Sequence, residues 1–150
     1  MGEIQSLIGS HAVVRLPANA TVLEAVQEMA ARNVGAVLVS GADLRPQGIF
    51  SERDLMRRVV LAGRDPSRVT LSEVMTRELY VVDRRSRTAQ VRKEMQERHI
   101  RHVPVLDDGV CVAVLSLRDL LRADLESCAF ELHETKLYIQ GEPALDEESA

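Results

Sequence analysis

An internal repeat constrains the fold of this 150-residue chain more than any other feature. Residues 22–39 align with residues 88–105 at an offset of 66. One residue is then lost in the next loop, and residues 48–58 align with residues 113–123 at an offset of 65. Self-similarity at a fixed period indicates that one supersecondary unit has been duplicated. The chain is therefore expected to fold as two equivalent halves.

Each copy has the pattern strand, helix, strand, strand, helix. In the first copy we expect strands at 13–16, 35–40 and 48–50 and helices at about 22–33 and 52–61. Asn19 or Thr21 can cap the first helix, and Ser51 can cap the second. The second copy repeats the plan from residue 79 to about 125, and Asp107 to Gly109 form a tight hairpin turn.

These patterns predict an α/β (α+β) fold in which two β-α-β-β-α repeats pack about a pseudo-two-fold axis. A half of about 60 residues leaves one face of its sheet open, so the halves must cover each other. We expect repeat 1 at 8–65, a linker at 66–78, repeat 2 at 79–127, a helical extension at 128–141 and a disordered acidic tail at 142–150. Gly141 and Pro143 are expected to end the last helix.

The last helix carries an apolar stripe at helical spacing, formed by Leu121, Leu125, Ala129, Leu132 and Ile139. An amphipathic helix outside the repeats must bury such a stripe, which favours a homodimer contact.

Composition and missing motifs narrow the function. The net charge of −4 hides a division, because residues 1–120 hold 17 basic and 15 acidic side chains and residues 121–150 hold 2 and 8. This balance argues against duplex DNA as a partner but permits a small anion. No long apolar run or signal peptide is visible, so a soluble, cytoplasmic protein without membrane contact is expected.

Neither a metal site nor catalysis is expected. Cys111 and Cys128 lack metal-ligand spacing and read as reduced thiols, and His11, His99 and His133 read as structural or exposed. No nucleophile motif appears, so the chain is not expected to be an enzyme.

The strongest chemical signal is a Ser-x-x-Asp sequence where a strand passes into a helix, present once in each repeat. The paired positions are Ser51 with Ser116, Arg53 with Arg118, and Asp54 with Asp119. A helix start offers free N–H groups to an anion, and the carboxylate suits the two hydroxyls of a ribose. The alternative is a capping box, in which serine and aspartate only satisfy the helix start. The repetition favours a ligand site.

Two further basic features are candidates. Arg101 and His102 open the strand equivalent to 35–40, where they can reach a phosphate in a cleft between the repeats, unless they form a solvated edge. The run Asp83 to Lys93 contains four arginines and a lysine and suggests RNA. It lacks interleaved aromatic residues, which favours a solvated helix face instead.

The doubled pattern resembles the cystathionine-β-synthase (CBS) domain family over about residues 8–127. The first copy carries the motif at Thr21, Val22, Glu24, Ala25, Met29, Gly48, Ser51 and Asp54. The second carries it at Met95, Arg98, Ile100 to Val105, Asp107 to Gly109, Ser116 and Asp119, after a linker Val74-Met75-Thr76. Ala113 and Arg87 depart from the pattern, at positions where the first repeat has Gly48 and Thr21.

This resemblance implies a stand-alone, non-enzymatic sensor whose clefts bind AMP, ADP, ATP, NAD(H) or S-adenosylmethionine, with no other cofactor required. It also implies a homodimer that signals through its conformation or through an effector protein. The implied ribose ligands are Asp54 and Asp119, and the implied phosphate ligands are Ser51, Arg53, Arg101, His102, Ser116 and Arg118. The implied adenine side is formed by Thr21, Gly35, Ala36, Val37, Val103 and Pro104. The alternative is an interaction module with empty clefts.

Overall fold

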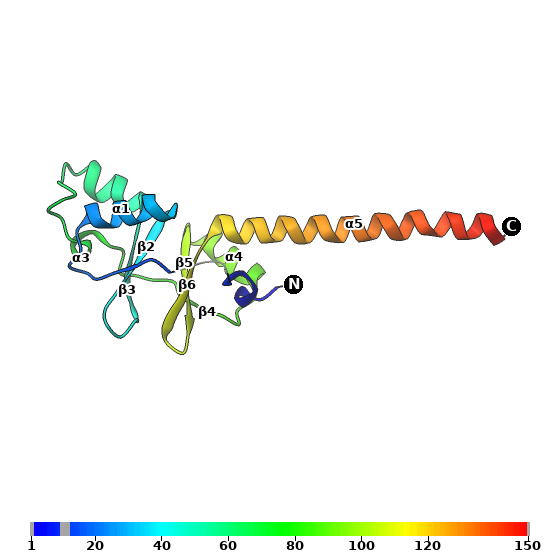
Figure 1. Ribbon diagram of the computed structural model, residues 1–150, viewed down its shortest axis with the longest axis horizontal. Coiled ribbons are helices and arrows are strands. Elements are labelled where there is room, and N and C mark those ends of the chain that lie inside the picture. The colour runs from blue at the N-terminus through cyan, green and yellow to red at the C-terminus, as the bar shows by residue number, and fades with distance from the viewer. Residues whose placement is uncertain (1, 10–12, 150) are drawn as a thin grey trace.

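The computed structural model describes residues 2–9 and 13–149, with side chains up to residue 135. In chain order, the elements up to residue 60 are a 3₁₀ helix Ile4–Leu7, β1 (Arg15–Leu16), α1 (Val22–Arg32), β2 (Ala36–Ser40), β3 (Pro46–Ser51), α2 (Glu52–Asp54) and a π-helix Leu55–Val60. The elements after residue 70 are α3 (Leu71–Val74), β4 (Val82–Asp83), α4 (Thr88–Glu97), β5 (His102–Asp107), β6 (Val110–Ser116) and α5 (Leu117–Ser149). Figure 1 shows the two halves side by side, with α5 projecting from the second.

Two three-stranded sheets with the same topology confirm the predicted repeat. Their strand orders are β1-β2-β3 and β4-β5-β6, each with one parallel and one antiparallel pairing. Ala36 pairs with Ser51 in the first sheet, and His102 pairs with Ser116 in the second. Both antiparallel pairs shift register at the same place, after Val39 and after Val105, which are equivalent at the offset of 66.

The predicted turn and cap chemistry is present. Asp108 and Gly109 have φ of 52° and 80°, and positive φ at both central residues is typical of a two-residue hairpin turn. Thr21, rather than Asn19, caps α1 through a capping box with Glu24.

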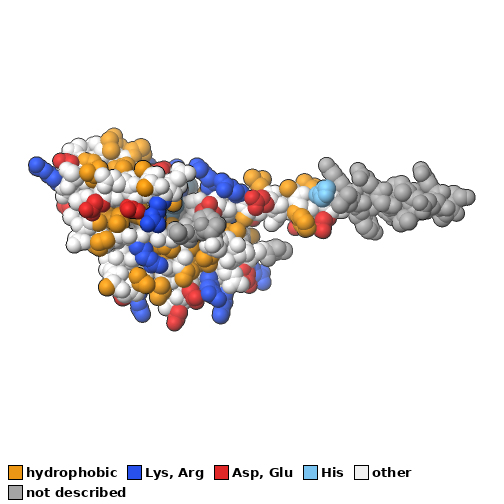
Figure 2. All heavy atoms as spheres, viewed as in Figure 1, with side chains coloured by type: hydrophobic (Ala, Val, Ile, Leu, Met, Phe, Trp, Pro, Cys, Tyr) orange, Lys and Arg blue, Asp and Glu red, His pale blue; other side chains and the backbone are white. Residues whose placement is uncertain are grey.

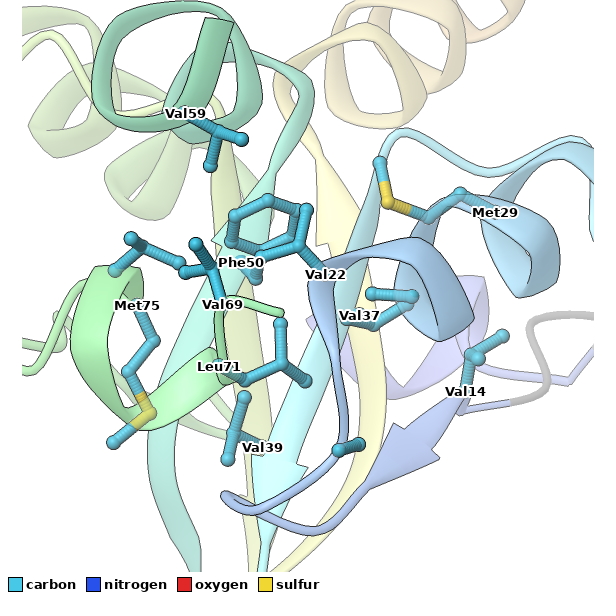
Figure 3. Close-up of a cluster of buried hydrophobic side chains, with 13 residues drawn as sticks. Val14, Val22, Met29, Val37, Val39, Phe50, Val59, Val69, Leu71 and Met75 are labelled. Atoms are coloured by element: carbon cyan, nitrogen blue, oxygen red, sulfur yellow. The ribbon is translucent and has the colours of Figure 1, made fainter. Parts of the chain in front are cut away.

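Two hydrophobic cores, rich in aliphatic side chains, fill the halves. The first gathers side chains from α1, β2, β3, the π-helix and the α3 region around Phe50 (Figure 3). The second is formed by Ile4, Val82, Val91, Met95, Val103, Val105, Ala113, Leu115 and Leu120. Core residues come from helices and strands of both halves, and the strand Ala36–Ser40 is buried along its whole length.

Each half is completed by a segment from outside its predicted repeat. The N-terminal 3₁₀ helix lies on the second half, where the Ile4 N–H donates to the Ser86 carbonyl at 2.8 Å and the Ile4 side chain is fully buried. The linker lies on the first half, where the Leu71 N–H donates to the Ala20 carbonyl at 2.9 Å and the Leu71 side chain is also fully buried. Both segments are part of the core.

The structure differs from the expected helices in three places. The linker contains a short helix, α3. The helix after Ser51 becomes a π-helix at Leu55. The expected end of the last helix at Gly141 and the disordered tail at 142–150 differ from the observed backbone, because α5 continues to Ser149. Gly141 and Pro143 lie within this helix, although a glycine costs a helix interior about 1 kcal/mol and a proline about 3 kcal/mol.

Candidate functional site

A cleft of about 310 Å³ opens between the halves at the first Ser-x-x-Asp junction, and we name it the Asp54 cleft. Its walls come from the start of α2, the π-helix, the end of the linker and the residues around the start of β5. Of the predicted site residues it contains Ser51, Arg53, Asp54, Arg101, His102 and Pro104. Residues from both repeats therefore meet in one cavity, whose size lies at the lower end of the range of about 300–1,000 Å³ for ligand pockets.

The Asp54 side chain lines the cleft, and the residue is only 8% exposed. Oδ2 accepts from the Ser51 N–H at 3.0 Å and from the Ser51 hydroxyl at 3.2 Å, so the capping box is present. Oδ1 accepts from the Thr76 hydroxyl at 3.1 Å. A carboxylate has about four acceptor positions, so Oδ1 keeps capacity for a ligand hydroxyl.

Arg58 ties the cleft to the linker. Its Nη1 donates to the carbonyls of Val74 and Met75, both at 3.0 Å, and its Nε lies 3.7 Å from Oδ1 of Asp54. Gly48 allows this close approach, because a Cβ there would lie 2.6 Å from Sδ of Met75. In the second repeat the equivalent of Gly48 is Ala113, which is buried in the core.

The backbone N–H groups at the start of α2 are less available than the sequence suggests. The Glu52 N–H donates to the Gly35 carbonyl at 3.0 Å, and the Asp54 N–H donates to Oγ of Ser51 at 3.4 Å. An anion in the cleft must rely mainly on side-chain cations. Four arginines line it beside three carboxylates: Arg53, Arg57, Arg58 and Arg101 against Glu52, Asp54 and Glu78.

His102 stands at the boundary between the halves. A Cβ on Gly35 would lie 3.3 Å from Nε2 of His102, so the imidazole of the second half packs against the backbone of the first. Burial lowers the pKa of His102, opposed by the carboxylates of Glu52, Asp119 and Asp54, while Arg101 lowers it further. The imidazole is therefore biased toward the neutral form.

This lowered pKa predicts a pH-dependent stability. As the pH falls below the ordinary histidine value of about 6.5, residue 102 of the unfolded chain takes up a proton and that of the folded chain resists it. The free energy of unfolding should then fall, whereas above that pH His102 adds no dependence. Urea unfolding at about pH 5.5 and about pH 7.5 measures this effect, which should be smaller in His102→Gln. The same pH dependence in both proteins would contradict it.

The remaining predicted site residues lie outside the Asp54 cleft. At the second junction the Ser116 N–H donates to Oδ2 of Asp119 at 2.8 Å, and the Asp119 N–H donates to Oγ of Ser116 at 3.1 Å. The side chains of Val37 and Val103 are fully buried in the two cores, so only their backbone could meet a ligand. Thr21, Gly35, Ala36 and Arg118 also do not line this cleft.

Sequence reasoning missed several residues of the cleft. Thr76 was visible in the linker motif and could have been proposed, whereas Arg57, Arg58, Glu78, Tyr80 and His99 carry no motif. Burial raises the pKa of Tyr80 to about 12, with a smaller contribution from its hydrogen bond to Glu94. The Arg98 guanidinium lies 4.8 Å from the Tyr80 ring centre. His99, expected to be structural or exposed, is exposed and also lines the cleft.

Other expectations concern metals, thiols and membranes. Within the described residues, no three His, Cys, Asp or Glu side chains are grouped to hold a metal ion. Cys111 is a buried free thiol, and Cys128 is a free thiol exposed on α5. His11 lies outside the described residues. In the described part of the chain, α5 included, no helix combines the length and apolarity of a membrane span.

Fold and cleft together define a tandem-repeat protein with a ligand-sized cavity between its halves. A family model for the CBS domain matches residues 4–61 and 71–126. The CBS domain-containing protein CBSX3, mitochondrial, of Arabidopsis thaliana is 33% identical over 125 residues, which cover 81% of this chain and 61% of that protein. The chain thus spans about three fifths of this relative.

Solved structures agree with the family match. The crystal structure of the CBS domain NE2398 has a TM-score of 0.77 and 33% identity, and the match covers 83% of this chain and 98% of that one. The CBS-domain containing protein ATU1752 from Agrobacterium tumefaciens has a TM-score of 0.75 and 30% identity, with 82% and 99% covered. The chain belongs to the CBS-domain family, whose tandem pairs are generally regulatory, non-catalytic modules that bind adenosyl ligands.

Proposed function

We propose that this chain is a regulatory module that binds an adenine nucleotide, such as AMP, ATP or NAD(H), in the Asp54 cleft. One observation carries the proposal: a buried carboxylate and a group of arginines from both repeats line the same cavity. The Asp54 carboxylate suits the ribose hydroxyls, and Arg53, Arg57 and Arg101 suit the phosphate, since guanidinium groups form paired hydrogen bonds with phosphate oxygens.

The signal is proposed to pass through a homodimer or to an effector protein. Met56 and Val60 on the π-helix are 51% and 63% exposed. Their equivalents at the offset of 65 are Leu121 and Leu125 on α5, which are 37% and 71% exposed. Hydrophobic side chains also line the described part of the α5 arm (Figure 2). Exposed apolar side chains at equivalent helical positions favour a helix-mediated contact with a second copy.

A structural interaction module with empty clefts is the second candidate. It is favoured by the capping box at Ser51 and by the bond from Thr76, which already give the Asp54 carboxylate partners. RNA binding through Asp83 to Lys93 has less support. Arg84 pairs with Asp107 and Arg92 pairs with Asp124, each at 2.9 Å. Figure 2 shows acidic and basic side chains interspersed over the visible face of the body.

Calorimetric titration tests the proposal. AMP, ATP, NADH and S-adenosylmethionine are titrated separately into folded protein from which bound nucleotide has been removed. We expect saturable heat with at least one phosphate-bearing ligand. Because the chain lacks Trp, nucleotide that co-purifies should also be visible in the ultraviolet spectrum. The absence of heat with all four ligands would leave the interaction module as the better interpretation.

A further inference from the structure

The two Ser-x-x-Asp junctions match in sequence, but the strand starts that accompany them do not. The Asp54 cleft receives Arg101 and His102 from the start of β5. At the offset of 66 the equivalent residues at the start of β2 are Gly35 and Ala36. Among the described residues, the start of β2 therefore offers no cation to the second junction.

Space beside Gly35 is already occupied from the other half. A Cβ at this position would lie 3.3 Å from Nε2 of His102 and 3.7 Å from Cδ of Glu52. A cationic side chain on residue 35 would have to displace the imidazole. The imidazole of His102 therefore occupies the space between the starts of β2 and β5, and His102 lines the Asp54 cleft.

The helices that follow the two junctions also differ, because the π-helix offers one more arginine than the equivalent positions of α5. Arg57 and Arg58 line the Asp54 cleft, and Arg58 also binds the carbonyls of the linker at 3.0 Å. At the offset of 65 their equivalents on α5 are Arg122 and Ala123. Alanine cannot form the bond to a carbonyl that Arg58 forms, so the second junction lacks this anchor.

We propose that the chain binds one phosphate-bearing nucleotide, in the Asp54 cleft. Arg101 and His102 determine that the ligand binds at the first Ser-x-x-Asp junction and not at the second. Asp119 then serves α5 as a capping residue rather than a ribose ligand. The inference rests on the proposed function and adds to it the number of ligands, their place and the charge they must carry. Adenosine has no anionic group for the arginines to bind, and S-adenosylmethionine offers them one carboxylate on a ligand whose net charge is positive.

The test uses the full chain and AMP as the probe in calorimetric titration. We expect one AMP per chain and binding of adenosine that is at least about tenfold weaker, because hydrogen bonds between charged groups are lost. The variant Arg101→Gly with His102→Ala gives β5 the opening residues of β2 and should weaken AMP binding by at least about tenfold. Should that variant fail to fold, Arg101→Gln at an exposed side chain replaces it.

Asp119→Asn is the matched control, since it preserves an acceptor for the Ser116 N–H. Its stoichiometry should equal that of the wild type and its AMP affinity should change much less than that of Asp54→Asn, although the Asp119 carboxylate acts on His102 through its charge. Two AMP per chain, or a larger loss in Asp119→Asn than in Asp54→Asn, would overturn the inference and leave the proposed function standing. A wild-type chain that binds none of the four adenosyl ligands would overturn both.

Discussion

Replacing Ile4 with alanine is expected to lower the free energy of unfolding by about 2–5 kcal/mol, the range for truncating a buried isoleucine. Ile4 is fully buried in the second core, although the sequence around it has no place in the repeat pattern. The backbone of the N-terminal segment is also bound, since the Ile4 N–H donates to the Ser86 carbonyl at 2.8 Å and the Thr88 N–H donates to the Gly2 carbonyl at 3.0 Å. The 3₁₀ helix therefore acts as a part of the second repeat.

Leu71→Ala provides the matched case in the first repeat, because Leu71 is equally buried in the first core. Urea unfolding should show a loss of similar size for both variants. Gln5→Ala, at an exposed neighbour of Ile4, is the control and should stay within about 0.5 kcal/mol of the wild type. An Ile4→Ala protein as stable as the Gln5→Ala protein would show that the N-terminal segment is not packed on the second core.

Local patterns predicted the repeated elements well, because each depends on nearby residues. The buried strand Ala36–Ser40 is a continuous β-branched and apolar run, and the turn at Asp108 and Gly109 needs only two residues that tolerate positive φ. The offset of 66 then carried these assignments from one half to the other. Assignments made in one half hold in the other because the strands pair in the same register, with Ser51 opposite Ala36 and Ser116 opposite His102.

Contacts between residues distant in the sequence were not predicted, because a local sequence pattern does not indicate which other segment it packs against. Ile4 binds a carbonyl 82 residues further along the chain. Thr76 donates to Asp54 across 22 residues. Asp54 was identified from its motif, but the number of its carboxylate acceptor positions that remain for a ligand depends on Thr76 in the linker. The inequality of the two junctions likewise depends on Gly35 and His102, which meet only in the folded chain.

The second large effect is expected from Asp54→Ala, which should reduce both stability and nucleotide affinity. The Ser51 N–H and the Thr76 hydroxyl would lose their acceptor in a part-buried site, at a cost of about 1–3 kcal/mol. Arg58 would lose the carboxylate that lies 3.7 Å from its Nε. AMP affinity should fall by about tenfold to 150-fold, which corresponds to the loss of about 1.5–3 kcal/mol from a hydrogen bond to a charged group.

Asp54→Asn separates the two effects, because the amide keeps one acceptor for the Ser51 N–H and its NH₂ group can donate to Oγ of Thr76. Urea unfolding should place this variant close to the wild type, while calorimetric titration with AMP should still show a large loss, since the charged acceptor for the ribose is gone. Unchanged AMP affinity in Asp54→Asn would remove the carboxylate charge from the ligand site. Unchanged stability in Asp54→Ala would contradict the network that joins α2 to the linker, and with it the physical reason for a pre-formed cleft at Asp54.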